Sequence, residues 1–166
     1  QPRPRVSVVI PTFNSLKTIR AALESCLAQT ALPFEIILVD DASSDGTADV
    51  AEVFLRDRVA ASGVPYRIIR HGKNEGPSKS RNDGWNCAEG DWIAFLDADD
   101  TWHPSKLETS LGVAALNPQA IMVAHAFEVA QSQAGATSWP ALPYRKPCVR
   151  AVSFIPLLLY NIIATP

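Results

Sequence analysis

The sequence lacks the marks of several protein classes. Its 3 cysteines are odd in number and have no metal-ligand spacing, which argues against a disulfide framework or a zinc site. Its 15 Lys and Arg nearly balance 17 Asp and Glu, which argues against a nucleic-acid binder with a basic surface. No apolar run reaches about 18 residues, and no signal peptide opens the chain. We therefore expect a cytoplasmic protein that binds no nucleic acid.

Four β-branched apolar runs, each followed at once by small or polar residues, form the main pattern of the chain. The runs predict strands that end at Ile10, Val39, Ile69 and Leu96. The chain has 166 residues, about the length of one domain, and 47% of them are hydrophobic, enough to build a core. In a parallel sheet the polar clusters after the strands meet at the carboxyl edge, where such sheets bind ligands. The pattern therefore predicts one composite binding site.

Helical periodicity separates the predicted strands. Apolar residues from Leu16 to Leu27 recur at helical spacing and predict a helix of about 14 residues, capped by Asn14 or Ser15. We expect a second helix from Asp45, a third from Pro77 to Ala88, a fourth from Pro104 to Leu116, and then a strand from Ala120 to Ala130. Three successive βαβ units favour a doubly wound, right-handed α/β sheet.

The segment Asp97 to Asp100 directly follows the fourth predicted strand. If the strand stays extended, Asp97 and Asp99 point to one side, because side chains alternate with period two. Two carboxylates roughly 5 Å apart repel by about 3 kcal/mol at an effective dielectric of about 20. A Mg²⁺ or Mn²⁺ ion would remove this repulsion and bind a diphosphate, whose oxygens complete its shell. The alternative is a turn whose carboxylates cap the helix near Pro104, a role that suits Asp100 best.

Asp40 and Asp41 end the second predicted strand. In dinucleotide-binding folds an acid at a strand end accepts hydrogen bonds from a ribose or a base, and Asp41 is the candidate for that role. Helix capping is the alternative, although residues 43–45 are better placed to cap the helix that follows. Arg81, in the third predicted helix, could meet phosphates, whereas Lys79 is expected on a solvated surface.

Four segments of the chain, in order, resemble family-2 glycosyltransferases with the GT-A fold. They are Val6 to Asn14, Ile37 to Thr47, Asn74 to Gly76 with Ser80 to Gly84, and Phe95 to Asp100. The resemblance covers about residues 5 to 108. It implies a Rossmann-like, three-layer αβα sandwich with a mainly parallel central sheet. It also implies an inverting transferase that uses a nucleotide-diphosphate sugar, most often a UDP-sugar, with Mg²⁺ or Mn²⁺.

Position by position, the resemblance implies that Pro11, Thr12, Asp41 and Arg81 hold the nucleoside and the phosphates. The full set of candidate donor-binding residues is Pro11, Thr12, Asn14, Asp40, Asp41, Asn74, Arg81, Asp97 and Ala98. Asp99 would ligate the metal directly, and Asp97 would approach the ribose, or the metal through water.

The sequence departs from the family pattern after residue 100. Inverting transfer needs a general base for the acceptor hydroxyl, which the family supplies as a downstream Asp or Glu. After Asp100 there is no Asp, and the carboxylates are Glu108, expected to be solvated, and Glu128, kept as a candidate base. We therefore expect one truncated domain, with the nucleotide-sugar half at about residues 5–108 and the start of the acceptor half at 109–166. The base is then expected beyond residue 166.

The acceptor is expected to be a saccharide, a lipid-linked compound or another hydroxyl compound. The segment from residue 131 to the end contains Arg145, Lys146 and Arg150 and no acid. These charges would suit an acceptor at the inner face of a membrane, although a solvated loop is the simpler interpretation.

Two other functions fit parts of the sequence. The chain could be a nucleotide-sugar-binding module without turnover. Asp97 also fits the nucleophile motif of haloacid-dehalogenase-type phosphatases. That class needs an acidic pair well downstream, which this sequence does not have.

Overall fold

The computed structural model describes residues 4–124, apart from the side chains of residues 59 and 60. The chain divides into two compact units, Gln1–Thr109 and Ser110–Pro166. The first unit holds all four strands of the described part. In the second unit the described residues complete the last helix, after which the Asn117 side chain donates a hydrogen bond back to the Val113 carbonyl oxygen at 2.8 Å. Among residues 4–124, no helix has both the length and the apolar character needed to cross a membrane.

The first unit is built on a four-stranded parallel sheet. The strands are β1 (Val6–Thr12), β2 (Glu35–Asp40), β3 (Tyr66–Arg70) and β4 (Trp92–Phe95), in the order β3-β2-β1-β4. Every residue of β1 and β2 is buried, which is the reason that both strands read as continuous apolar runs. The sequence prediction of a parallel sheet from these four runs is confirmed.

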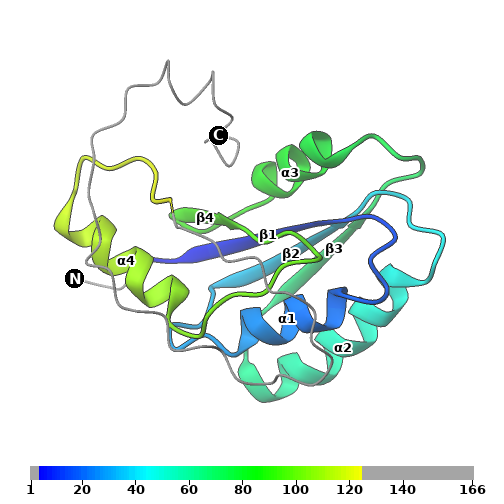
Figure 1. Cartoon of the computed structure of the whole chain (residues 1–166), viewed down its shortest axis with the longest axis horizontal. Helices are drawn as coiled ribbons and strands as arrows, with labels where there is room; N and C mark the ends of the chain where they lie inside the picture. The colour runs from blue at the N-terminus through cyan, green and yellow to red at the C-terminus, as the bar shows by residue number, and fades with distance from the viewer. Residues whose placement is uncertain (1–3, 125–166) are drawn as a thin grey trace, which may run out of the picture. The chain divides into compact units, whose positions relative to one another are not determined.

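Helices cover both faces of this sheet. The helices are α1 (Ile19–Leu27), α2 (Thr47–Ser62), α3 (Pro77–Asn86) and α4 (Lys106–Leu116). In Figure 1, α1 and α2 lie below the sheet and α3 lies above it. The first unit is therefore the three-layer αβα sandwich that the family resemblance implied.

The strand order creates a switch point between β1 and β4. The chain moves outward from β1 to β2 to β3, and then returns across the sheet to place β4 on the other side of β1. At such a point the loops after the two neighbouring strands run in opposite directions. This leaves room for a ligand at the carboxyl edge of the sheet. The register places Thr12 beside Asp40, so the loops after β1 and β2 start at the same level.

Helix α3 packs closely against one face of the sheet at a glycine. Val9, Ile37 and Val39 are fully buried and form the centre of this layer of the core. A Cβ atom at Gly84 would lie 2.3 Å from Val9 Cγ1 and 3.2 Å from Val39 Cγ2. Only glycine therefore allows α3 to approach the sheet this closely.

Several element boundaries differ from the sequence predictions. The first helix has nine residues rather than about 14, because residues 16–18 form an irregular turn before it begins. Asn14 and Ser15 do not cap it, since its N-cap is Thr18 without a side-chain bond. The fourth helix begins at Lys106 rather than Pro104. Residues 120–124 are not in a strand, and the rest of the strand expected up to residue 130 lies outside the described residues.

The packing at Gly84 makes a direct prediction. Gly84→Ala should lower the free energy of unfolding by about 1–3 kcal/mol, because the added methyl group overpacks the core at Val9. Gly112→Ala is the matched control: it also lies in a helix, and its Cβ would meet no described atom within 4 Å. Urea denaturation of both variants checks this, and an unchanged midpoint for Gly84→Ala would contradict the packing.

Candidate functional site

A cleft of about 820 Å³ lies at the carboxyl edge of the sheet. It is formed by the ends of β1 and β2, the loop before α3, the first turns of α3 and the turn after β4. The lining residues are Pro11, Thr12, Phe13, Asn14, Ser15, Leu16, Lys17, Thr18, Asp41, Asp45, Asn74, Pro77, Ser80, Arg81, Asp97, Ala98 and Asp99. All of the candidate donor-binding and metal-binding residues except Asp40 are in this set. The structure therefore brings the separate sequence motifs to one place.

Asp41, a carboxylate of the cleft, accepts three hydrogen bonds from within the chain. Its Oδ1 accepts hydrogen bonds from the Glu75 amide at 2.8 Å and from His71 Nδ1 at 2.7 Å. Its Oδ2 accepts from the Gly76 amide at 2.7 Å. Burial acts to raise the pKa of Asp41, but these hydrogen bonds outweigh burial and hold the pKa below its ordinary value. Because a carboxylate offers about four acceptor positions, Oδ2 keeps one for a ligand.

Gly76 fixes the geometry around Asp41. It is the N-cap of α3 and has φ 90, a backbone conformation that favours glycine. This conformation turns the Glu75 and Gly76 amides toward Asp41, at the positive end of the helix dipole. The Asn-Glu-Gly motif is thus explained by the anchoring of one carboxylate.

Asp40 has a different position from its neighbour. It is buried and is not among the residues that line the cleft, although its place at the strand end made it a candidate for ligand binding. Its Oδ2 accepts a hydrogen bond from the Ser43 amide at 3.1 Å. This bond closes a turn in which Ala42 takes the unusual φ of 61. Asp40 therefore shapes the turn that carries Asp41.

The loop after β1 is tied to the loop after β2. The Asn14 amide donates to Ser43 Oγ, and Asn14 Oδ1 accepts from the Ser44 amide, both at 2.9 Å. Asn14 has φ 48, in the left-handed region that asparagine tolerates better than most residues. Nearby, the Ser15 amide donates to Thr47 Oγ1 at 2.8 Å. These bonds hold the loop after β1, which forms one wall of the cleft, against the loop after β2.

Arg81 and Asp97 form an ion pair across the cleft. Arg81 Nη2 donates to Asp97 Oδ1 at 2.5 Å, and the two side chains are 22% and 45% exposed. The pair joins α3 to the segment after β4. Arg81 also presents further guanidinium donors at a position where a phosphate could bind.

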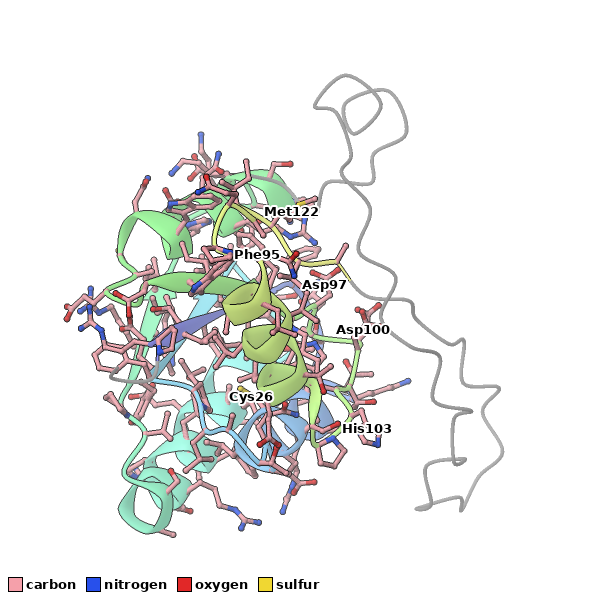
Figure 2. All side chains as sticks on the ribbon, turned by 90° about the vertical axis from the view of Figure 1, so that its left-hand side faces the viewer. Cys26, Phe95, Asp97, Asp100, His103 and Met122 are labelled. Carbon is pink, nitrogen blue, oxygen red and sulfur yellow. The ribbon has the colours of Figure 1, made fainter. Side chains whose placement is uncertain are left out.

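The acidic segment after β4 is a turn and not an extended strand. β4 ends at Phe95, and the Asp100 amide donates to the Asp97 carbonyl oxygen at 3.0 Å. The expectation that Asp97 and Asp99 share a face through strand alternation is wrong, yet both still line the cleft because the turn carries them there. Figure 2 shows this segment running from Phe95 past Asp97 and Asp100 to His103 on one side of the ribbon. Burial raises the pKa of Asp100, and the charges of Asp99 and Asp97 raise it further.

The donor set of the turn suits a hard divalent cation. Within residues 4–124 no group of three or more His, Cys, Asp and Glu side chains could enclose a metal ion. Mg²⁺, however, commonly binds through one or two carboxylates together with substrate phosphates. Asp99 is exposed and lines the cleft, and Asp97 keeps its second oxygen free of the Arg81 bond. The residues present therefore fit a cation that is held jointly with a phosphate ligand.

Phe13 and Lys17 are among the lining residues that the sequence prediction missed. Phe13 is 47% exposed and lines the cleft. Lys17 adds an exposed cation to the same wall. The available signal was the place of Phe13 in the chain, directly between the two candidate residues Thr12 and Asn14.

Of the two downstream carboxylates, Glu108 is described by the structure and does not line the cleft. Glu108 Oε2 accepts a hydrogen bond from Thr30 Oγ1 at 2.7 Å, and Glu108 is not among the lining residues. Glu128 lies outside the described residues.

Comparison with known proteins relates this site to one family. The chain matches the family Glycosyl transferase family 2 over residues 7–147. Succinoglycan biosynthesis protein ExoO of Rhizobium meliloti is 40% identical over 104 residues, which are 63% of this chain and 28% of that protein.

Solved structures give the same relation. Residues 1–349 of S. aureus TarS, crystallised in complex with UDP, superpose with a TM-score of 0.61 at 30% identity, over 69% of this chain and 33% of that one. The mannosyltransferase PcManGT of Pyrobaculum calidifontis, in complex with GDP-Man and Mn²⁺, gives a TM-score of 0.60 at 26% identity, over 70% and 33%. This chain thus spans 28% to 33% of the length of these proteins. Its sequence motifs, its αβα sandwich and its match over residues 7–147 together show that the chain belongs to glycosyl transferase family 2, with the GT-A fold.

Proposed function

We propose that this chain binds a nucleotide-diphosphate sugar, specifically a UDP-sugar, together with Mg²⁺ or Mn²⁺. In the whole protein the sugar would be transferred to an acceptor hydroxyl of a saccharide or lipid-linked compound with inversion. One observation carries the proposal: a single cleft holds the bonded Asp41 carboxylate, the Arg81 guanidinium and the Asp97 and Asp99 carboxylates. These groups suit the nucleobase or ribose and the phosphates of one nucleotide, together with the metal ion that it binds.

The nucleoside would bind at Asp41. Its remaining acceptor position can take an N–H or O–H donor from the base or ribose. The exposed ring of Phe13 in the same cleft can stack on a base, because every base has a π face. A uracil nucleotide is favoured because TarS has been crystallised with UDP and with UDP-GlcNAc.

The diphosphate would bind between Arg81 and the acidic turn. Arg81 can form bidentate hydrogen bonds to phosphate oxygens. Asp99, with Asp97, would hold the divalent cation, in line with the Mn²⁺ in the PcManGT complex. A bound cation supplies charge stabilisation for the departing diphosphate.

Inversion requires a base from the acceptor half. The base removes the proton of the acceptor hydroxyl, the acceptor oxygen forms a bond to the anomeric carbon, and the bond to the nucleoside diphosphate breaks on the opposite face. Glu108, bonded to Thr30 outside the cleft, does not fit this role. We propose that the base follows residue 166, with Glu128 as the candidate within the chain.

The phosphatase alternative is set aside. A phosphatase of that class needs an acidic pair downstream of the nucleophile. After Asp100 this sequence has only Glu108 and Glu128 as carboxylates, and the chain belongs to glycosyl transferase family 2.

The metal assignment predicts a loss that depends on Mn²⁺. Asp99→Asn should reduce the Mn²⁺-dependent gain in UDP affinity by about tenfold or more, or about 1.4 kcal/mol. The fold should persist, because the exposed side chain has no packing role. Asp100→Asn, one residue further and not lining the cleft, is the control. Calorimetric titration of UDP with and without Mn²⁺ measures both, and equal affinities for wild type and Asp99→Asn would refute the assignment.

The two ends of the nucleotide should respond to different substitutions. Asp41→Asn should weaken uridine and UDP alike, whereas Arg81→Ala should weaken UDP about tenfold or more and leave uridine unchanged, since hydrogen bonds to charged groups contribute about 1.5–3 kcal/mol. Titrations of each variant with uridine and with UDP check this. An equal loss of both ligands in Arg81→Ala would show that the roles are assigned wrongly.

Turnover should require more than these 166 residues. The chain should bind UDP and a divalent cation but transfer sugar at a rate lower by about 10² to 10⁴ than a longer protein that includes the base. A sugar-transfer assay with one donor and one acceptor compares the two. Comparable transfer by the 166-residue chain, abolished in Glu128→Gln, would instead make Glu128 the base. Absence of transfer in the longer protein as well would favour a binding module without turnover.

A further inference from the structure

His71 lies behind the cleft, between two carboxylates. It follows β3 directly, and its amide donates to the Asp40 carbonyl oxygen at 2.8 Å. Its side chain is 8% exposed. Nδ1 lies 2.7 Å from Asp41 Oδ1, and Nε2 lies 2.9 Å from Asp83 Oδ2. The ring therefore bridges the carboxylate that faces the cleft to a second carboxylate on α3.

This geometry requires two protons on the ring. Ionised carboxylates only accept hydrogen bonds, so each ring nitrogen must donate, and only the imidazolium does so at both. The hydrogen bond to Asp41 raises the pKa of His71, burial opposes this, and the hydrogen bond to Asp83 raises the pKa further. The net direction is upward from the ordinary value of 6.5. A neutral ring would instead turn a nitrogen lone pair toward one of the two carboxylates.

The bridge connects the two ends of the proposed ligand site. Asp41 belongs to the nucleoside end, and Asp83 lies on α3, the helix that also carries Arg81. Asp83 is held in turn by Lys79, one turn earlier on the same helix. The Asp41 carboxylate is therefore fixed relative to α3 by a charged ring as well as by the Gly76 amide.

We infer that His71, as an imidazolium, is a positioning residue for nucleoside binding: it holds Asp41 so that the free acceptor position of Oδ2 faces the cleft. This inference rests on the proposed function. His71 itself does not line the cleft, so it acts through Asp41.

The two carboxylates that contact the ring, and the lysine that holds one of them, stay charged near neutral pH. The pKa values of Asp41 and Asp83 are held below their ordinary values, and the pKa of Lys79 is raised by its bond to Asp83. In the loop beside the ring, Lys73 and Glu75 face each other at 3.8 Å. The imidazolium is present below the raised pKa of His71 and is lost as the pH rises through it. Nucleoside affinity should therefore fall as the pH rises above the pKa of His71.

Two substitutions separate the two nitrogens of His71. His71→Asn places an amide donor near the position of Nδ1 and mimics a ring that is always neutral. His71→Gln places its donor near Nε2 and leaves Asp41 without that partner. Wild-type affinity for uridine should fall about threefold or more between about pH 6 and about pH 8.5. At every pH, His71→Asn should have the affinity for uridine that wild type has at about pH 8.5. His71→Gln should bind uridine about threefold more weakly than His71→Asn.

A third variant and a control complete the titration. Asp83→Asn lies outside the cleft and should move the alkaline loss of uridine affinity to lower pH, because the ring loses one of its anionic partners. His103→Asn should keep the wild-type profile. A flat wild-type profile, or equal uridine affinities for His71→Asn, His71→Gln and wild type, would overturn the inference while leaving the proposed function standing. No uridine binding by wild type at any pH would overturn both.

A measurement without ligand tests the charge of His71 directly. In ¹⁵N-resolved spectra of the histidine side chains at about pH 7, the signals absent from His71→Asn should show two protonated nitrogens, because each ring nitrogen faces an ionised carboxylate and must donate a hydrogen bond to it. A neutral tautomer at that pH would refute the inference, whatever the protein binds.

Discussion

The cleft depends on one buried carboxylate and the donors that surround it. Asp41 collects hydrogen bonds from His71, Glu75 and Gly76, and its own amide donates to the Thr12 carbonyl oxygen at 2.9 Å. Four parts of the first unit are therefore joined at one residue: β1, the end of β2, the loop after β3 and the start of α3. An unpaired charge at this depth would cost several kcal/mol, so these bonds must form together when the unit folds.

The topology of the sheet explains why the chemistry collects beside this carboxylate. The chain crosses from β3 back to β4, which places the acidic turn after β4 next to the end of β1. Gly84 allows α3 to lie close to the sheet, and α3 carries Arg81 to the ion pair with Asp97. Backbone packing thus sets the separation between the nucleoside end and the phosphate end of the proposed site.

Residue patterns predicted the sheet, its layers and most of the cleft, because strand ends in a parallel sheet must share an edge. They did not predict the partners of Asp41, which lie 30 to 35 positions away and meet it only through the register of β2 and β3. The two neighbours Asp40 and Asp41 look equivalent in sequence, and only the turn at Ala42 separates a buried structural role from a cleft position. Strand alternation failed at Asp97 and Asp99, because a hydrogen-bonded turn, and not an extended segment, follows the fourth strand.

The central claim is that the carboxyl-edge cleft is the site of a metal-bound nucleoside diphosphate. A crystal structure of the chain with UDP and Mn²⁺, with anomalous data collected for manganese, tests it most directly. The account predicts the uracil or ribose on Asp41, the phosphates near Arg81, and an anomalous peak on Asp99 with Asp97 in its surroundings. UDP or Mn²⁺ bound away from this cleft, with Asp41 and Asp99 uncontacted, would contradict it.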